Sequence, residues 1–316
     1  MCALKSYYVI DSHCDTIFKI ANFGIQAFHN GEFHVSLEGL RKGRVGLQFF
    51  AAIIDQKAGA SCLQQGLRLI DAYYSMLNTF PDILVTITKP QDINLAKANN
   101  KIGAMLTVEG GEILEGELLN LRILYQLGVR AMTLTWNYRN EIADGAMESS
   151  SKGGLSLFGH EVVKEMNRLG MIIDVSHLSD KGFYDVLETT KSPVAATHSN
   201  AWSIHPHPRN LKDEQIQLLA ENRGVIGINF YPPFLSDNEA SLGDIIRHIE
   251  HIAALAGIDV IGFGADFDGI EERPADIKGP QHYDKIINAL LQLNYSEADV
   301  KKIAFENYER LLVEIL

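Results

Sequence analysis

Two side chains that bind metals in many proteins, His13 and Asp15, closely follow the apolar stretch 7–10. In an extended chain, residues two apart point to the same face, so we expect His13 and Asp15 to project together and Cys14 to point towards the packed core. A neutral imidazole beside a carboxylate suits a divalent transition metal, most simply zinc. On its own, such a pair is more often a buried histidine near a surface acid. A metal site therefore needs partners elsewhere in the chain.

Similar side chains stand at the ends of apolar stretches farther along the chain. They are Glu109, His177, His198, Asp266 and Asp268. Each has an ordinary explanation by itself, such as a turn cap for Glu109 or a hydrogen-bonded core position for either histidine. When parallel strands close a barrel, however, their carboxyl ends meet on one face. We therefore interpret these residues together as one metal site.

The number of candidate ligands indicates two metal ions. Three histidines and two carboxylates exceed the three protein ligands of a mononuclear catalytic zinc site. They suit two metals about 3.5–4 Å apart that share one bridging carboxylate. We expect His13, Asp15 and Glu109 on one metal, and Glu109, His177 and His198 on the other. A water or hydroxide between the metals would have its pKa lowered towards neutrality and would act as the nucleophile.

Two further residues have side chains suited to handling protons and substrate. Asp266 has no ligand role in this arrangement, so we expect it to be the general base or proton shuttle. Arg209 lies in a proline-rich loop that follows the stretch ending at His198. Its guanidinium suits bidentate capture of a substrate carboxylate, and a surface ion pair is the alternative reading.

Eight apolar, strand-like stretches would position these residues, and each is followed by helical sequence. They are 7–10, 45–54, 102–109, 130–136, 171–177, 193–198, 225–230 and 260–266. Strict alternation of strand and helix predicts parallel strands, and eight units favour a single (β/α)₈ TIM barrel over residues 1–316. We expect one helix over 16–29 and another over 36–42 with Ser36 as its N-cap. An open doubly wound oxidoreductase is the alternative fold, but no Gly-x-Gly-x-x-Gly follows the first strand.

Composition limits the partners. The net charge of −12, from 28 basic and 40 acidic residues, argues against nucleic acid or an anionic membrane as the main partner. The three cysteines, Cys2, Cys14 and Cys62, are too few and too scattered for a disulfide framework. The sequence starts without a secretion signal, and no apolar run approaches the roughly 20 residues of a membrane span. We expect a cytoplasmic protein.

The motifs taken together resemble the membrane dipeptidase (renal dipeptidase) family of zinc metallopeptidases from Ile10 to about Leu311. The matching segments are Asp11-Ser-His13-Cys-Asp15, Val108-Glu109-Gly-Gly111, Asp174-Val-Ser-His177, Thr197-His198-Ser199, Pro208-Arg209-Asn210 and Gly264-Ala-Asp266-Phe-Asp268-Gly269. The resemblance implies an amidohydrolase-like barrel with two zinc ions per chain on the five ligands proposed above. It also implies a small dipeptide substrate, which can carry a C-terminal D-residue, and a homodimer. In that likeness Arg209 holds the substrate carboxylate and Asp266 passes a proton to the leaving amine.

One position departs from the family pattern. Family members carry a histidine at the end of the fourth strand, in a Leu-Thr-His context, where it contacts the substrate and the developing oxyanion. Here Trp136 follows Leu134 and Thr135. Loss of one oxyanion donor costs on the order of 10²–10³ in rate. Asn137, Tyr138 or the indole N–H of Trp136 are the candidates to replace it.

Two other functions remain open from the sequence. A different binuclear amidohydrolase would act on a cyclic amide or a lactone, but such barrels often need His-x-His after the first strand and a bridging lysine after the fourth. This chain has His13-Cys-Asp15 and Trp136 at those places. The second alternative is a barrel that binds metal with little turnover, and the replacement of histidine by Trp136 is the feature that favours it.

Overall fold

The computed structural model describes residues 7–55 and 59–316, so Cys2 lies outside the described residues. Nine parallel strands form one sheet. They are β1 (Val9–Asp11), β2 (Val45–Ile53), β3 (Leu84–Thr86), β4 (Ile102–Glu109), β5 (Val129–Thr133), β6 (Ile172–Asp174), β7 (Ala195–Ser199), β8 (Val225–Ile228) and β9 (Ile261–Phe263).

Eight of these strands close into a barrel, which confirms the predicted (β/α)₈ architecture. Each strand of the ring pairs with the next, β1 pairs with both β2 and β9, and the pairing of β2 with β4 closes the circle. The remaining strand, β3, runs beside the beginning of β4. The strand β3 was not predicted from the sequence, because three residues, of which only Leu84 is buried, give no recognisable apolar run.

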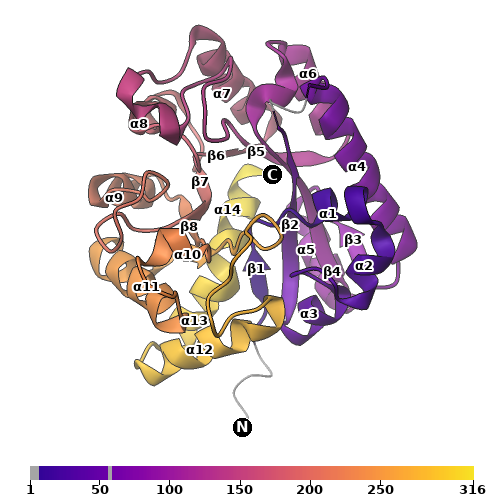
Figure 1. Cartoon of the computed structure of the whole chain (residues 1–316), viewed down its shortest axis with the longest axis vertical. Helices are drawn as coiled ribbons and strands as arrows, with labels where there is room; N and C mark the ends of the chain where they lie inside the picture. Colours follow the sequence, from indigo (N-terminus) through magenta and orange to yellow (C-terminus); the bar gives the residue numbers. More distant parts are fainter. Residues whose placement is uncertain (1–6, 56–58) are drawn as a thin grey trace.

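Helices surround the strands (Figure 1). They are α1 (Thr16–Phe23), α2 (Ile25–Asn30), α3 (Leu37–Lys42), α4 (Cys62–Thr79), α5 (Pro90–Ala98), α6 (Leu118–Gln126), α7 (Leu157–Leu169), α8 (Asp180–Thr189), α9 (Asp213–Glu221), α10 (Pro232–Leu235), α11 (Leu242–Ala256), α12 (Tyr283–Gln292), α13 (Glu297–Lys301) and α14 (Asn307–Ile315). No helix in the described part of the chain is long and apolar enough to cross a membrane.

Capping side chains and glycine residues set the helix boundaries, and only some of these boundaries were predicted from the sequence. The Ser36 hydroxyl accepts a hydrogen bond from the backbone N–H of Gly39, so the predicted N-cap of α3 is confirmed. The single helix predicted over 16–29 was wrong. Gly24 has φ of 87° and separates α1 from α2, a conformation that glycine adopts without the steric cost of a side chain.

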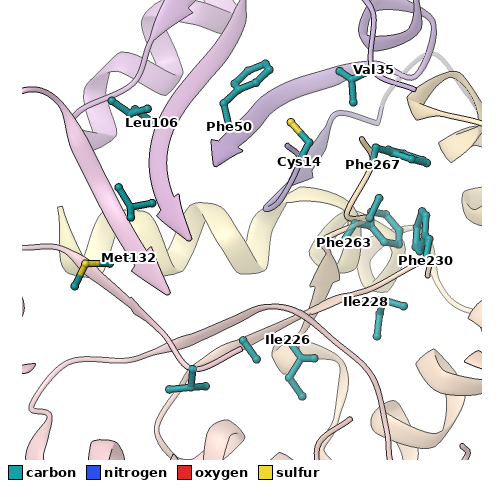
Figure 2. Packing of buried hydrophobic residues seen from close by; sticks show 14 of the residues in the cluster. Cys14, Val35, Phe50, Leu106, Met132, Ile226, Ile228, Phe230, Phe263 and Phe267 are labelled. Carbon is teal, nitrogen blue, oxygen red and sulfur yellow. The ribbon is translucent and has the colours of Figure 1, made fainter. Parts of the chain in front are cut away.

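Most of the hydrophobic core lies between the outer surface of the barrel and the helices. Figure 2 shows outward-facing side chains of several strands in this layer, among them Phe50, Leu106 and Ile226. Cys14 belongs to the same layer, is fully buried, and places its thiol 3.3 Å from the carbonyl oxygen of Phe49. Cys14 is therefore a packed thiol that points away from the barrel interior, as the strand alternation predicted.

The barrel interior forms a second, smaller core that the C-terminal helix closes. Strand side chains meet the last helical segment there: Ile10, Leu47, Phe49, Met105, Ala131, Ile172, Ala195 and Val225 lie with Phe305, Tyr308, Leu311 and Leu312. In Figure 1, α14 lies at the centre of the ring of strands. The Tyr308 hydroxyl lies 2.7 Å from that of Ser12, next to the metal-binding stretch. The helix α14 thus acts as a plug in one end of the barrel. Through Tyr308 it contacts the segment that carries His13 and Asp15.

If α14 closes the barrel, shortening a side chain on its buried face should markedly lower the free energy of unfolding. Leu311 is fully buried, so Leu311→Ala should lower the free energy of unfolding by about 2–5 kcal/mol. Val313 lies on the same helix but is 62 % exposed, and Val313→Ala should change that free energy by less than about 0.5 kcal/mol. Urea unfolding of both variants measures the difference. Equal midpoints for the two variants would contradict the role of α14 as a plug.

Candidate metal centre

The five predicted metal-binding side chains come together at the carboxyl ends of the strands, with Glu109 at their centre. One oxygen of Glu109, Oε2, lies 3.4 Å from His13 Nε2. The other, Oε1, lies 2.9 Å from His177 Nε2 and 3.4 Å from His198 Nε2. Asp15 completes the group, with its Oδ1 3.8 Å from His13 Nε2. Because its two oxygens face different histidines, Glu109 has the geometry of a bridge between two metal ions.

Three polar atoms of this cluster are buried without a hydrogen-bond partner among the described residues. They are His13 Nε2, Asp15 Oδ1 and Glu109 Oε2. Leaving such atoms unsatisfied costs about 1–3 kcal/mol each, and more for charged groups. Ligand atoms lie within 4.8 Å of one another in two overlapping groups, one of His13, Glu109 and His198, and one of His13, Asp15 and Asp266. Nitrogen and carboxylate oxygen donors are the atoms that zinc binds, so the residues fit a metal centre.

The electrostatics of the cluster favour a cation at its centre. Burial would lower the pKa of His13, but Glu109 and the other neighbouring carboxylates raise it to about 10. Burial and the charge of Glu109 raise the pKa of Asp15 well above its usual range. Burial lowers the pKa of His177 to about 4, and burial together with His13 lowers that of His198 well below its usual value. These two imidazoles are neutral near pH 7, which is the form that binds metals.

Two hydrogen bonds orient the imidazoles of His177 and His198. Asn137 Oδ1 lies 2.8 Å from His177 Nδ1, and a carbonyl oxygen can only accept, so this nitrogen carries the proton. Thr197 Oγ1 donates to the carboxylate of Asp174 and lies 2.8 Å from His198 Nδ1. Because its own proton points at Asp174, the Thr197 hydroxyl accepts a hydrogen bond from Nδ1–H of His198. With the proton on Nδ1, the Nε2 atom of each imidazole is unprotonated. Its lone pair is directed towards Glu109 and can bind a metal ion there.

Asp174 joins three strands behind the cluster, and the sequence analysis assigned it no role. Its carboxylate accepts hydrogen bonds from the Thr133 hydroxyl on β5, from the Ser176 amide, and from both the amide and the hydroxyl of Thr197 on β7. Burial would raise the pKa of Asp174, but His198 and these donors hold it below its usual range. The position of Asp174 in the motif that ends at His177 was a sequence signal for a role at the site. The sequence did not show that Thr133 and Thr197, which are distant in the chain, donate to its carboxylate.

Asp11 has a similar supporting role behind His13. Its carboxylate accepts hydrogen bonds from the backbone N–H of His13 at 3.2 Å, from that of Ala265 at 3.0 Å, and from the Tyr283 hydroxyl at 2.7 Å. Burial raises the pKa of Asp11 despite these donors. The carboxylate therefore ties the turn after β1 to the turn after β9, and so fixes His13 relative to the segment that carries Asp266.

Three residues on this face have a left-handed backbone conformation, which is uncommon for residues other than glycine. They are His177, Asp266 and Asp268, with φ of 67°, 63° and 68°. Such conformations cost energy and occur where the surrounding structure fixes them, often at functional sites. The strands β6 and β9 end at Asp174 and Phe263, three residues before His177 and Asp266, where the predicted stretches 171–177 and 260–266 end.

Asp266 lies beside the cluster, whereas Asp268 does not contribute to it. Asp266 Oδ1 is 3.8 Å from His13 Nε2, and its Oδ2 accepts a hydrogen bond of 2.9 Å from Asn229 Nδ2. Burial, with Glu109 adding to it, raises the pKa of Asp266 to about 6. A carboxylate with this pKa is suited to proton transfer near neutral pH. The Asp268 carboxylate instead accepts hydrogen bonds from the Thr16 hydroxyl and two backbone amides.

Arg209 is buried next to the cluster, which rules out the surface ion pair considered as an alternative. Only 3 % of its surface is exposed, and Nη2 donates to the carbonyl oxygen of His198 at 3.1 Å. Its Nε is buried without a hydrogen-bond partner in the described part of the chain. Burial lowers the pKa of Arg209 to about 10, so it stays cationic at neutral pH. The guanidinium is thus a fixed cation within the field of Glu109 and Asp266.

Aromatic side chains follow β5 at the place where the family resemblance implied a histidine. The Trp136 ring centroid lies 6.3 Å from that of His177 and 6.2 Å from that of Tyr138. Tyr138 is 40 % exposed and thus accessible to a substrate. Asn137 contacts His177 through its carbonyl oxygen, a contact that the sequence did not predict. The substrate-binding roles of Asn137 and Tyr138 stay predictions.

A (β/α)₈ barrel with histidines and carboxylates gathered at its strand ends defines the class of metal-dependent hydrolases. Within this class, the sequence model of the membrane dipeptidase family, peptidase family M19, matches residues 3–315. The chain belongs to this family. It is therefore an enzyme, a hydrolase that acts on peptide bonds, and the family implies a metal cofactor.

Related proteins agree with this assignment. The chain is 34 % identical to "Dipeptidase aclJ" of Aspergillus oryzae over 294 residues, which cover 89 % of this chain and 70 % of that protein. Its fold matches the crystal structure of dipeptidase AC, a family M19 metallopeptidase, with a TM-score of 0.91 at 24 % identity, covering 98 % and 99 % of the two chains. It also matches a metallopeptidase from Rhodobacter sphaeroides, liganded with a phosphinate mimic of L-Ala-D-Ala, with a TM-score of 0.90, 24 % identity and the same coverage.

The contact between Asn137 and His177 predicts a role for Asn137 in metal affinity. Asn137→Ala removes the acceptor that fixes the His177 tautomer, so zinc affinity should fall about 10- to 100-fold. Competition with a chromophoric chelator measures this affinity. Asn238→Ala, on an exposed loop, is the matched control and should leave the affinity unchanged. An Asn137→Ala variant with the affinity of the control would show that His177 needs no such support.

Proposed function

We propose that this protein is a zinc-dependent dipeptidase with two zinc ions per chain. His13, Asp15 and Glu109 would hold one ion, and Glu109, His177 and His198 the other. The observation that carries the proposal is the position of Glu109, whose two carboxylate oxygens face His13 on one side and the other histidines on the other. The unsatisfied buried atoms of His13, Asp15 and Glu109 support it, since bound cations would satisfy them.

Arg209 would select substrates with a free C-terminal carboxylate. Its guanidinium is fixed by burial and by its bond to the His198 carbonyl, so little side-chain entropy is lost when a substrate binds. Its Nε has no partner among the described residues and is available to a ligand. A dipeptide places its terminal carboxylate one residue from the scissile carbonyl. Anchoring the carboxylate at Arg209 would thus bring that carbonyl to the neighbouring metal-binding residues.

Asp266 would move the proton that hydrolysis requires. Zinc ions on the five residues would activate a water as the nucleophile and polarise the scissile carbonyl. Asp266 Oδ1 faces the cluster and is ionised above about pH 6, so it can accept the proton of the nucleophile. It can then donate that proton to the departing amine. Asn229 fixes the other carboxylate oxygen and keeps Oδ1 directed at the cluster.

The substrate class rests on the family and on its members. A dipeptide mimic with a C-terminal D-residue is bound in the Rhodobacter sphaeroides metallopeptidase, and we infer that this chain also accepts such dipeptides. Asn137 and Tyr138 would contact the substrate from the loop after β5. Cyclic amides and lactones are disfavoured because the matching family is one of peptidases. The little-turnover alternative is disfavoured by Asp266, which is positioned for proton transfer.

We further infer that residues 1–316 form one domain, because the barrel uses strands from β1 to β9 and α14 closes it. A cytoplasmic location and a homodimer stay predictions of the sequence.

Assay of a small dipeptide panel tests the proposed function. Metal-loaded enzyme should hydrolyse L-Ala-D-Ala and L-Ala-L-Ala, and a chelator should abolish both activities until zinc is restored. L-Ala-D-Ala amide should be a poor substrate, because it lacks the carboxylate that Arg209 would bind. Absence of chelator-sensitive cleavage across the dipeptides would refute the proposal. Equal cleavage of the amide and the acid would refute the role of Arg209.

The proton-transfer role of Asp266 predicts a separation of turnover from metal binding. Asp266→Asn keeps the size and one carbonyl oxygen, but it cannot accept the proton. We expect kcat for L-Ala-D-Ala to fall about 10²- to 10⁴-fold while the zinc content stays the same. Asp237→Asn, on an exposed loop, controls for the loss of one negative charge. Loss of zinc in Asp266→Asn would instead identify Asp266 as a ligand.

A further inference from the structure

A second pocket lies at the opposite end of the barrel from the metal centre. It has a volume of about 360 Å³, within the range of small-molecule sites. Its walls come from the beginnings of β1, β2 and β4, from the ends of α3 and α5, and from the segment before β3. The lining residues are Tyr8, Leu40, Arg41, Arg44, Val45, Ile83, Lys97, Asn100, Lys101 and Ile102.

The charge of this pocket contrasts with that of the chain. Four cations line it, Arg41, Arg44, Lys97 and Lys101, and none of its lining residues in the described part of the chain is acidic. The chain as a whole carries a net charge of −12. Like charges gathered around one concave surface repel one another, and a bound anion would relieve that repulsion. The pocket therefore has the electrostatic character of an anion site.

Two of the four cations are fixed, and two are available. Lys97 Nζ donates to Glu309 at 2.9 Å and lies 3.8 Å from the centre of the Phe305 ring. Lys101 Nζ donates to the carbonyl oxygen of Pro81 at 2.7 Å. The guanidinium groups of Arg41 and Arg44 have no hydrogen bond or ion pair within residues 7–55 and 59–316. The pocket thus has two lysines whose ammonium groups are held in place and two guanidinium groups that can donate hydrogen bonds to a ligand.

We propose that this pocket binds a small organic molecule with two or more negative charges, carried by phosphate or carboxylate groups. Guanidinium groups bind both kinds of oxyanion bidentately, which suits Arg41 and Arg44. The apolar side chains of the lining and the Tyr8 ring, which is 47 % exposed, would pack against the organic part of the molecule. Inorganic ions alone would leave this apolar surface uncovered.

The site is separate from the catalytic centre, so the proposal does not depend on the proposed function. It lies at the start of β1 and β4, whereas His13 and Glu109 follow or end the same strands. A molecule bound here cannot contact the substrate directly. Its binding is consequently measurable without any assay of peptide hydrolysis.

Isothermal titration calorimetry of the zinc-loaded protein at about 0.15 M salt tests the proposal, with ADP and citrate as probes and pyrophosphate as an inorganic comparison. We expect saturable binding of at least one of the two organic probes at one site per chain, tighter than that of pyrophosphate and at least 10-fold weaker in the double variant R41Q/R44Q. Tighter binding of ADP than of citrate would identify phosphate as the preferred group, and the reverse would identify carboxylate. The double variant R223Q/R247Q loses the same charge from exposed arginines outside the pocket and should bind like the parent.

Binding to the zinc ions of the catalytic centre would be unaffected by R41Q/R44Q, so the loss of affinity in that variant separates the two places. The variant R209Q removes the arginine of the catalytic centre and should leave probe affinity unchanged. Unfolding midpoints of all variants show that each is folded. Three results would overturn the proposal: no saturable binding of any probe, equal binding by R41Q/R44Q and the parent, or binding that R209Q abolishes and R41Q/R44Q retains.

Discussion

The interaction on which the site depends is the contact of one buried carboxylate, Glu109, with three imidazoles. Each of its oxygens faces different histidines, and the strands that supply them can only meet if the barrel closes in the observed register. A buried carboxylate is costly unless it is paired. Asp11 and Asp174 are the supports that hold the imidazole-bearing segments in place around it. The buried atoms of His13, Asp15 and Glu109 that lack a hydrogen-bond partner among the described residues would be satisfied by bound cations.

The sequence was sufficient to predict the barrel and the grouping of His13, Asp15 and Glu109. Strand and helix alternate strictly, and parallel strands bring their carboxyl ends to one face, so residues far apart in the chain become neighbours. The alternation of strands and helices does not predict which residues hydrogen-bond to the buried carboxylates Asp11 and Asp174. Thr133, Thr197 and Tyr283 are ordinary residues in sequence, and only the register of the strands and the packing of α12 place them against buried carboxylates. The short strand β3 and the break at Gly24 were missed because each depends on local backbone geometry rather than on an apolar pattern.

Position 136 shows how the structure changed the interpretation of the site. From sequence, Trp136 stood where the family resemblance implied a substrate-contacting histidine, and its neighbours were considered as replacements. In the structure, Asn137 contacts His177, and Trp136 and Tyr138 form an aromatic pair beside it. The loop after β5 therefore orients the His177 imidazole through Asn137 and carries the exposed Tyr138 ring. At the opposite end of the barrel, four cations line a pocket that is separate from this site.

Anomalous diffraction at the zinc edge would show whether two metal ions share the Glu109 carboxylate. Crystals of protein loaded with zinc and then freed of excess metal should show two peaks per chain, about 3.5–4 Å apart. The Glu109 carboxylate should lie between them, with His13 and Asp15 on one peak and His177 and His198 on the other. A single peak, no peak, or two peaks that do not share Glu109 would contradict the account.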